Sequence, residues 1–333
     1  MGKNAIMSTK TAVVLFNLGG PGCLRCVRPF LRNLFADPAI IGLPNPFRFL
    51  LAEFISRKRE KEAQNNYALM GGKSPIEAES EKQRFALQAL LDNEFSDQQF
   101  KCVLAMRYWG SSAEQAQRDI KNWGADRIIL LPLYPQFSTT TTVSFFTHWQ
   151  KHDQIGLPVQ KISSYETDPA FIDAHVEGIL AHYKKNGSPK NTRVIMSAHG
   201  LPEKIIAAGD PYQSQIEASC AAIKDKLPKA LQDMQIAYQI RVGPLKWIGP
   251  STEEEINRAA KDKKGVLIVP IAFVSEHIET LVELDIDYRK VAENLGLSHY
   301  LRVPALGTAP KYIQALSEQV KAVMIREKNE LSG

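Results

Sequence analysis

The sequence has no apolar run of about 18 or more residues, the length that a helix needs to cross a bilayer. Its first residues, Met1 to Lys10, lack the apolar segment of a secretory signal. The 333-residue chain also lacks the biased composition of disordered, collagen-like or repeat proteins, because 44% of its residues are hydrophobic and 23% are charged. We therefore expect a folded protein without a membrane span, long enough for about two domains.

The sequence contains few cysteines and no large excess of positive or negative charge. Four cysteines are too few for a disulfide framework, which favours a reducing compartment and a cytoplasmic location. The 41 Lys and Arg residues exceed the 36 Asp and Glu residues enough to give a net charge of +5, which mildly favours anionic ligands. No basic stripe with interleaved aromatic residues is present, so the sequence argues against binding of nucleic acid.

Short runs rich in Val, Ile and Leu alternate with segments of helical periodicity. Such runs are typical of buried parallel strands in β-α-β units, so the pattern predicts an α/β fold. Ligands bind such sheets at the carboxyl ends of the strands, and residues just past each strand are therefore candidates for a site. The predicted strands are Thr11 to Asn17, Phe100 to Tyr108, Arg127 to Tyr134, Thr192 to Ala198, Gln235 to Val242, Gly265 to Phe273 and Tyr300 to Ala305.

Two of the predicted strand ends resemble each other. Segments 130–134 and 268–272 are apolar, contain a proline and lead to a serine, Ser138 or Ser275, that can cap the next helix. This similarity favours two related halves divided near residue 160, and two unrelated strand ends with ordinary helix caps are the alternative. The predicted helix from Ala309 to Arg326 can pack against the first half.

A glycine turn and a histidine follow two of the predicted strands. The turn from Asn17 to Gly22 does not match the GxGxxG pattern, so we expect a structural turn and no dinucleotide site. His199 directly follows the strand Thr192 to Ala198 and has Gly200 beside it. An imidazole at that edge can accept protons from a ligand near neutral pH. A structural histidine is the alternative.

The segment 275–287 is a predicted helix with four carboxylates on one face. Like charges at helical spacing repel, so this face is either fully solvated or holds a cation. Its start beside His277, at the end of a strand, favours a divalent transition metal such as Fe²⁺, Zn²⁺ or Co²⁺. The carboxylates, spaced at i, i+3, i+7 and i+11, are Glu276, Glu279, Glu283 and Asp287.

Two pairs of residues have the spacing of metal or redox motifs but lack the rest of them. Cys23 and Cys26 form a single CxxC, which we interpret as two incidental thiols because a structural zinc site would need a second pair. A redox role is the alternative. His148 and His152 are four residues apart without the glutamate of HExxH, so we interpret them as surface residues.

Apolar residues precede a basic cluster between Ile40 and Lys61. Such a segment suits a membrane-surface patch or the lip of an apolar pocket for an anionic ligand. A buried helix followed by solvated charges is the alternative. The apolar residues, which lead to the run Arg57 to Lys61, are Leu43, Phe47, Phe49, Leu50, Leu51, Phe54 and Ile55.

Several long segments between Thr11 and Lys311 are together similar to ferrochelatases, the enzymes that insert Fe²⁺ into a porphyrin to make haem. Their number and length make chance agreement negligible. The segments are Asn17 to Pro21, Tyr67 to Ile76, Met106 to Tyr108, Tyr134 to Ser138, Ser197 to Pro202, Gly209 to Tyr212, Val242 to Pro250 and Val269 to Leu281.

The resemblance implies two Rossmann-like domains, each a four-stranded parallel sheet flanked by helices, with a porphyrin cleft between them. We expect the first domain to comprise residues 8–160 and 305–330, with a hydrophobic lip at 40–55. The second domain is then 161–304 and carries His199 and the acidic helix.

The resemblance also implies a role for each site residue. His199 is the expected catalytic histidine, Glu279 is the carboxylate that faces it, and Arg59 and Ser74 hold the porphyrin propionates. The expected metal-handling residues are His199, Glu279, Glu283, Glu276 and Asp287. Expected porphyrin contacts also include Leu18, Tyr67, Arg107, Tyr108, Tyr134, Trp247 and Phe273.

The implied reaction determines what the side chains must do. A flat porphyrin hides its nitrogen lone pairs in the ring plane, so the site must bind a bent ring more tightly than a flat one. Two pyrrole protons must leave as the metal enters. His199 is the expected proton acceptor, and Glu279 relays protons or removes water from the metal.

The turn around Leu18 is more similar to the protoporphyrin-using branch of the family than to the coproporphyrin-using branch. We therefore expect protoporphyrin IX and Fe²⁺ as substrates and protohaem as product, in the last step of haem synthesis. No Cys follows Cys220, so we expect no [2Fe-2S] cluster, and the reaction needs no organic cofactor.

The expected protein is thus a cytoplasmic lyase in peripheral contact with the inner membrane face through its lip. Two alternatives stay open. One is a related chelatase that inserts Co²⁺ or Ni²⁺ into another tetrapyrrole. The other is a non-catalytic haem or porphyrin carrier, against which the presence of both His199 and the acidic helix argues.

Overall fold

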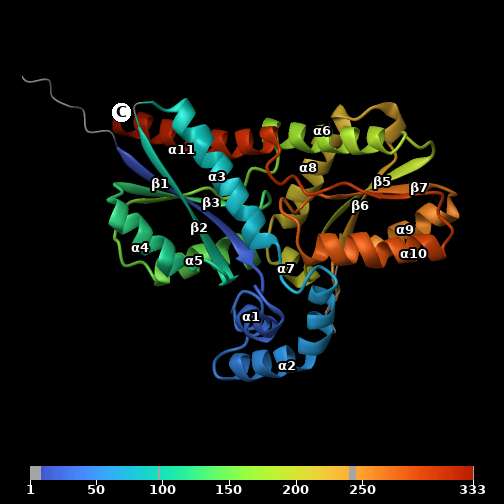
Figure 1. Cartoon of the computed structure of the whole chain (residues 1–333), viewed down its shortest axis with the longest axis horizontal. Coiled ribbons are helices and arrows are strands. Elements are labelled where there is room, and N and C mark those ends of the chain that lie inside the picture. Colours follow the sequence, from blue (N-terminus) through green and yellow to red (C-terminus); the bar gives the residue numbers. More distant parts are fainter. Residues whose placement is uncertain (1–8, 97, 240–244, 333) are drawn as a thin grey trace, which may run out of the picture.

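The computed structural model describes residues 9–96, 98–239 and 245–332. Two four-stranded parallel sheets lie side by side in this part of the chain (Figure 1), which confirms the predicted α/β fold. The first sheet has the order β2 (Gln99–Trp109), β1 (Lys10–Gly19), β3 (Arg127–Pro132) and β4 (Val159–Lys161). The second has the order β6 (Met234–Gln239), β5 (Thr192–His199), β7 (Gly265–Pro270) and β8 (Tyr300–Arg302).

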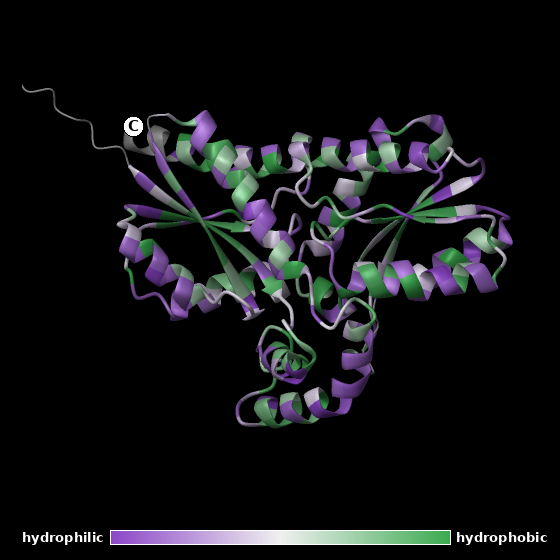
Figure 2. Cartoon of the chain, viewed as in Figure 1, coloured by the Kyte–Doolittle hydropathy of each residue, from purple (hydrophilic) through white to green (hydrophobic). Residues whose placement is uncertain are grey.

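The central strand β1 illustrates why these segments form strands. All residues from Thr11 to Asn17 are buried, and most of them are apolar or β-branched. A strand that is covered by helices on both faces requires such a run. Figure 2 shows the same hydrophobic character in the strands at the centre of both halves.

All seven predicted strands form, with ends that shift by a few residues. The sequence pattern misses β4, because that strand has three residues and Val159 is its only strongly apolar one. The predicted strand Gln235 to Val242 begins one residue earlier and is described as far as Gln239, and its last residues lie outside the described part.

The two sheets repeat one topology, since each strand of the second sheet corresponds to the strand four places earlier in the first. The similar segments 130–134 and 268–272 start in the equivalent strands β3 and β7. Each of these strands leads to a π-helix, η2 (Thr139–Val143) or η4 (Glu279–Asp287). The topology therefore supports the interpretation of two related halves, and their division into domains near residue 160 stays a prediction.

Helices cover both faces of the first sheet. α4 (Ala113–Trp123) and α5 (Ser144–Lys151) pack on one face, where they contact alternate residues of β1. α3 (Ile76–Glu94) and α11 (Pro310–Ser332) lie on the other face. α11 is the helix predicted from Ala309 onward, and it packs against α3 and β3 of the first half and against α6 (Pro169–Lys185) of the second.

The second sheet is covered in the same way. α9 (Thr252–Lys261) and α10 (Tyr288–Asn294) pack on one face. α6 (Pro169–Lys185) and α8 (Tyr212–Lys226) pack on the other. The two short helices that complete this half are α7 (Glu203–Ala207) and the 3₁₀ turn η3 (Lys229–Leu231). No helix in the described ranges is long and apolar enough to span a membrane.

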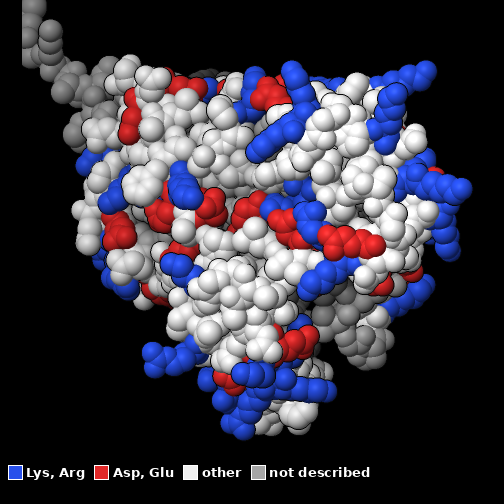
Figure 3. All heavy atoms as spheres, turned by 45° about the vertical axis from the view of Figure 1, so that its right-hand side comes forward, with Lys and Arg blue, Asp and Glu red and all other residues white. Residues whose placement is uncertain are grey.

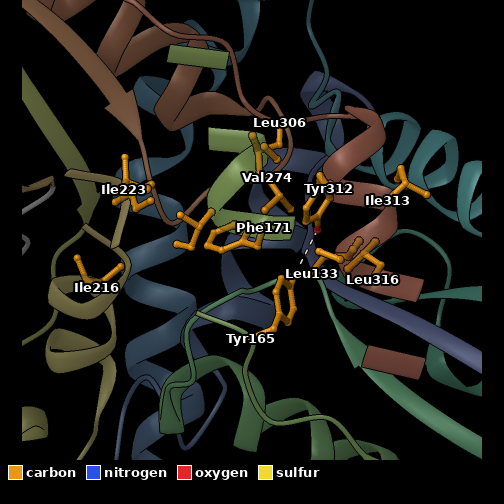
Figure 4. Packing of buried hydrophobic residues seen from close by; sticks show 14 of the residues in the cluster. Leu133, Tyr165, Phe171, Ile216, Ile223, Val274, Leu306, Tyr312, Ile313 and Leu316 are labelled. Carbon is orange, nitrogen blue, oxygen red and sulfur yellow. Dashed lines mark hydrogen bonds between the residues drawn. The ribbon is translucent and has the colours of Figure 1, made fainter. Parts of the chain in front are cut away.

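One continuous hydrophobic core extends through both halves. It joins Leu133 at the end of the first sheet to Phe171 of α6, Ile216 of α8 and Leu316 of α11 (Figure 4). At its centre the hydroxyl groups of Tyr165 and Tyr312 lie 3.2 Å apart. The halves are thus fixed to each other by buried apolar surface, which contributes about 25 cal/mol per Å² removed from water.

A lobe of two helices, α1 (Val27–Phe35) and α2 (Phe47–Ala68), projects from the first half (Figure 1). Phe47, Leu50 and Phe54 lie on α2 with 63%, 65% and 63% of their surface exposed. The alternative of a buried helix in this segment is therefore wrong. The exposed apolar side chains agree with the prediction of a lip.

The lobe begins with the 3₁₀ turn η1 (Leu24–Cys26), in which Cys23 and Cys26 form a disulfide. The interpretation of these cysteines as two incidental free thiols is therefore wrong. The bridge spans three residues and joins no separate elements, so it is not the framework of a disulfide-rich protein. The other cysteines, Cys102 and Cys220, are buried and free.

Candidate active site

His199 is the last residue of β5, at the carboxyl edge of the second sheet. Its Nδ1 lies 3.0 Å from Oε2 of Glu279. A carboxylate accepts hydrogen bonds, so Nδ1 carries the proton and donates it. In the neutral ring this leaves Nε2 as the nitrogen that can accept a proton from a ligand.

Burial and charge oppose each other in this pair. Burial lowers the pKa of His199, but the charge and hydrogen bond of Glu279 and the charge of Glu283 outweigh it and raise that pKa overall. Burial raises the pKa of Glu279, whereas the charge and hydrogen bond of His199 and the charge of His277 lower it overall. The pair therefore stabilises an imidazolium beside a carboxylate, so that His199 can hold a proton that it has accepted.

Glu279, Glu283 and Asp287 form what we call the acidic row. They lie at four-residue intervals along the π-helix η4, which starts at Glu279. The wide turn of a π-helix keeps residues at this spacing on one side of the helix. Exposure increases along the row, from a Glu279 side chain that is 14% exposed to an exposed Asp287. The row thus leads from solvent to His199.

The predicted helical stripe is wrong at its first member, Glu276. The helix does not start at Ser275, and Glu276 lies in the loop before it. Its Oε1 accepts hydrogen bonds from Arg302 and from the backbone N–H of Ala305 at 3.0 Å, whereas its Oε2 is buried without a hydrogen-bond partner. Glu276 is therefore held in an ion pair with Arg302 and is not part of the acidic row.

Ser275 also differs from its predicted role as a helix cap. Its hydroxyl donates a 3.2 Å hydrogen bond to Gln83 instead, because η4 starts four residues later, at Glu279. The equivalent serine of the first half, Ser138, does cap η2, since its side chain accepts a hydrogen bond from the N–H of Thr140.

Glu283 lies between the other two carboxylates of the row. Burial, followed by the charge of Glu279, raises the pKa of Glu283 to about 8. Gln239, the last residue of β6, donates to Oε2 of Glu283 at 3.3 Å. At neutral pH this carboxyl group is therefore mostly protonated, which reduces the repulsion within the acidic row.

Glu283→Gln should raise the melting temperature at pH 9 and change it little at pH 5. The pKa of this carboxyl rises from 4.5 to about 8 on folding, so the folded chain binds the proton more tightly. Stability is then lost as the pH rises from about 5 through 8. The neutral amide avoids that loss. Thermal unfolding at both pH values tests this, with the exposed Asp287→Asn as control, and equal shifts at the two pH values would contradict it.

His277 is a buried histidine beside the pair. Its Nδ1 lies 3.2 Å from the carbonyl oxygen of Ser275, to which it must donate. Its Nε2 is buried without a hydrogen-bond partner and lies 4.0 Å from Oε1 of Glu279. Burial lowers the pKa of His277, so its ring favours the neutral form. A nitrogen lone pair thus lies near a carboxylate oxygen, an arrangement that a divalent cation would stabilise.

Aromatic residues of the first half pack near the segment that carries Glu279. Tyr67 of α2 and Tyr108 of β2 share a buried cluster with α1, and Leu18 and Ile278 pack against it. Ile278 directly precedes Glu279, whose charge, after burial, contributes to raising the pKa of Tyr67. The expected contacts Leu18, Tyr67 and Tyr108 therefore share a cluster with Ile278, the residue next to Glu279, where the two halves meet.

Three further residues that we expected to contact the porphyrin, Phe273, Tyr134 and Arg107, each lie in different surroundings. Phe273 packs against His277, with ring centroids 4.4 Å apart. Tyr134 has a buried hydroxyl group without a hydrogen-bond partner. Arg107 donates at 2.6 Å to the buried carboxylate of Asp37 and at 3.0 Å to the hydroxyl of Ser144. The structure thus holds the Arg107 guanidinium in an internal ion pair.

Ser74 lies against the glycine turn. Its N–H donates to the carbonyl of Pro21 at 2.8 Å, and a Cβ on Gly20 would come within 2.6 Å of the Ser74 Cβ. Gly20 is therefore required for this close approach, as expected of a structural turn.

Trp247 is half-buried and pairs with Pro202 in a β-bridge. Pro202 is the third residue after His199 in the sequence. Residues 242–244, which precede Trp247, lie outside the described part.

Three buried polar residues that sequence reasoning missed connect the site to the fold. Gln83 of α3 donates to the carbonyl groups of Val274 and Gly307, at 2.9 and 3.0 Å. Asp210 accepts from the N–H of Thr139 at 2.7 Å and so ties η2 to the second half. Asp37 holds Arg107. Gln239, a fourth residue that was missed, had a signal in the sequence, because it lies near the end of a predicted strand.

Comparisons with known proteins identify related sequences and a similar fold. The family model described as ferrochelatase matches residues 10–324. A ferrochelatase of Caulobacter vibrioides is 53% identical over 316 residues, which cover 95% of this chain and 90% of that protein. One of Phenylobacterium zucineum is 48% identical, with coverage of 95% and 92%. The structure of SirB from Bacillus subtilis with Fe³⁺ has a similar fold, with a TM-score of 0.55, 11% identity and 94% coverage of each chain. The chain belongs to the ferrochelatase family.

Proposed function

We propose that this chain inserts Fe²⁺ into a porphyrin to form haem. The observation that carries the proposal is the hydrogen-bonded pair of His199 and Glu279, at the inner end of the acidic row. Metal insertion needs a group that accepts the pyrrole protons, and carboxylates can guide the metal ion to the porphyrin. The chain's membership of the ferrochelatase family supports the same reaction.

The pair accounts for removal of the pyrrole protons. With Nδ1 bound to Glu279, Nε2 of His199 accepts a proton from a pyrrole nitrogen, and the resulting imidazolium is stabilised by the carboxylate. The charge and hydrogen bond of Glu279 raise the pKa of His199 and so favour this transfer. The proton can leave along the acidic row, which ends at the exposed Asp287.

Fe²⁺ is the second substrate, and the acidic row is its proposed route. Carboxylate oxygens and water hold a divalent ion without the tight ligation of thiolates, so the ion can move on to the porphyrin. Glu279 and the free Nε2 of His277 lie at the inner end, where the ion loses water. Entry from the opposite face of the porphyrin would leave the acidic row without this role.

An anaerobic assay with protoporphyrin IX and Fe²⁺ tests the function. We expect many turnovers per chain, and changes in the Soret and Q absorption bands of the porphyrin measure them. A stoichiometric spectral shift without turnover would favour a porphyrin carrier instead. Turnover with Co²⁺ or Ni²⁺ but not Fe²⁺ would favour the related chelatases. Parallel assays with coproporphyrin test the proposed preference for protoporphyrin IX, which rests on Leu18 beside the site.

Arg59→Ala should raise the KM for porphyrin by about 10-fold and leave kcat nearly unchanged. Arg59 is half-buried on α2 and forms no ion pair within the described residues, so its charge is available for a propionate. A charge-assisted hydrogen bond of this kind contributes about 1.5 kcal/mol or more. Steady-state kinetics of Arg59→Ala measure the effect. Arg57→Ala is the control, because the Arg57 side chain is paired with Glu53. Equal KM values for wild type and Arg59→Ala would place the propionates elsewhere.

We also propose that the lip touches the membrane surface. Figure 3 shows Lys and Arg side chains at the end of the projecting lobe, with a few Asp and Glu side chains beside them, and the exposed apolar residues of the lobe are Phe47, Phe49, Leu50 and Phe54. Exposed aromatic residues beside basic residues suit the interface of an anionic bilayer. Phe47→Ser combined with Phe54→Ser should abolish sedimentation with anionic vesicles, and unchanged sedimentation would count against the contact. The enzyme would then be a cytoplasmic lyase, without an organic cofactor, that works at the membrane.

A further inference from the structure

Glu114, His148 and His152 lie together outside the candidate active site. α4 supplies Glu114 in its first turn, and α5 supplies His148 in its last turn and His152 as its C-cap. The possible ligand atoms of the three side chains all lie within 4.8 Å of one another. In the described part of the chain no other three His, Cys, Asp or Glu side chains meet that distance.

The packing of two helices creates this group. α4 and α5 lie next to each other on one face of the first sheet (Figure 1), where Ala113, Ala116 and Phe145 belong to one buried cluster. The loop after α5 is tied to α4, because the side chain of the buried Gln117 accepts a 3.1 Å hydrogen bond from the N–H of Gln154. The three side chains are therefore held by rigid elements, which favours a preformed site.

His152 has its ring orientation fixed by the backbone. Its Nδ1 lies 2.8 Å from the carbonyl oxygen of His148, so Nδ1 must be the protonated nitrogen that donates. Its Nε2 then carries the lone pair. This is the usual outer-shell arrangement of a metal-binding histidine, in which one ring N–H is bonded to a carbonyl group and the other nitrogen faces the metal.

His148 faces both partners without a hydrogen bond to Glu114. Its ring lies 4.4 Å from the ring of His152, between centroids, and its Nε2 lies 3.9 Å from Oε1 of Glu114. That distance is too long for a hydrogen bond. Ligand atoms around an ion with bonds of about 2.1 Å lie roughly 3 to 4 Å apart, so the 3.9 Å between Nε2 of His148 and Oε1 of Glu114 suits a shared ion.

The charge balance of the group also suits a cation. Burial, followed by the charge of Arg107, lowers the pKa of His148 to about 4, so its imidazole is neutral at pH 7. Arg107 itself is paired with Asp37 at 2.6 Å, which offsets its repulsion. Burial raises the pKa of Glu114, but hydrogen bonds at the start of α4 outweigh it and lower that pKa overall, so this carboxylate is charged.

We propose that Glu114, His148 and His152 form a second metal site, which binds a divalent transition-metal ion such as Zn²⁺ or Co²⁺. Two imidazole nitrogens and one carboxylate oxygen suit this class of ion, whereas Ca²⁺ and Mg²⁺ prefer oxygen ligands. Three protein ligands leave a position for water. The HExxH motif is incomplete in the sequence because the carboxylate comes from another helix. His148 and His152, interpreted from the sequence as surface residues, are half-buried and lie beside Glu114.

Calorimetric titration of the metal-free full chain with Zn²⁺ tests the site without porphyrin or turnover. A background of His199→Ala with Glu279→Gln removes two expected ligands of the active site. In that background we expect one Zn²⁺ to bind per chain. Adding His152→Ala should weaken this binding by at least 10-fold, and adding Glu114→Gln should weaken it as well.

Two controls make the result specific. His182→Ala removes a half-buried histidine of α6 that belongs to no such group, and it should leave Zn²⁺ binding unchanged. Circular dichroism and thermal unfolding verify that His152→Ala is folded. Co²⁺ gives a second signal, because a site with two imidazoles and few ligands has intense visible absorption that hexaaqua-Co²⁺ lacks.

The outcomes separate this proposal from the proposed iron insertion. The second site would be overturned if adding His152→Ala or Glu114→Gln to the double-variant background left the chain folded and its Zn²⁺ affinity unchanged. This conclusion would hold whether or not the chain inserts metal into porphyrins. Loss of Zn²⁺ and of the Co²⁺ absorption in both variants, with both retained in His182→Ala, supports the site even if no porphyrin is metallated.

Discussion

His199→Ala should lower the rate of iron insertion by about 10²- to 10⁴-fold, the usual contribution of a positioned acid or base. The variant removes the imidazole that donates to Glu279 and leaves no side chain at the end of β5 to accept a pyrrole proton. Porphyrin should still bind, because the aromatic wall of Tyr67 and Tyr108 is unchanged. Anaerobic turnover and porphyrin fluorescence titration measure the two effects separately.

His182→Ala is the matched control for this variant, since it replaces a half-buried histidine on α6 that is not part of the His199–Glu279 pair. It should keep near-normal turnover. Near-normal turnover of His199→Ala itself would overturn the role of this residue as proton acceptor. Loss of porphyrin binding in His199→Ala would instead indicate a role in holding the substrate.

Glu279→Gln should lower kcat by about 10²-fold or more and should lower the pKa of His199 below its usual value. The amide has nearly the same shape as the carboxylate but no charge. Burial lowers the pKa of His199, and the charge of Glu279 is the first of the opposing causes that raise it. Without that charge, the imidazolium is less stable in its buried position.

Titration of the His199 ring by nuclear magnetic resonance gives the pKa directly, and steady-state kinetics give kcat. Asp287→Asn, at the exposed end of the acidic row, is the control and should shift the pKa of His199 far less. An unchanged pKa of His199 in Glu279→Gln would show that the charge of Glu279 does not stabilise the imidazolium.

The general architecture could be predicted from local sequence patterns. A buried parallel strand is a continuous apolar run, and seven of the strands have such a run of sufficient length. β4 lacks it, because its pairing with β3 is determined by tertiary contacts and not by its own three residues. The place of His199 followed from the same logic, since the carboxyl ends of parallel strands meet at one edge of a sheet.

The acidic row was predicted only in part, because the sequence does not reveal a π-helix. With ordinary helical geometry, Glu276 falls on the same face as Glu279. In the structure the chain between Ser275 and His277 is a loop, and Arg302 draws Glu276 away from that face. The ion pair joins residues 26 positions apart, and no local pattern predicts such a contact.

Residues that depend on tertiary contacts were missed for the same reason. Glu114 and the pair His148 and His152 are distant in the sequence and meet because α4 and α5 pack together. Gln83 reaches the loop before η4 across nearly 200 residues of chain. A buried glutamine in an amphipathic helix has no signature that would mark it as a tether of the active site.

The hydrophobic core common to both halves, with Tyr165 and Tyr312 at its centre, restricts how a large flat substrate can enter. A jaw-like opening of the halves would pull apart that packing and hydrate it, at a cost proportional to the apolar area exposed. The helices α1 and α2 instead pack in a small cluster that includes Tyr108 of β2. We therefore expect the lobe formed by α1 and α2 to move when the substrate enters the site, while the two sheets keep their relative position.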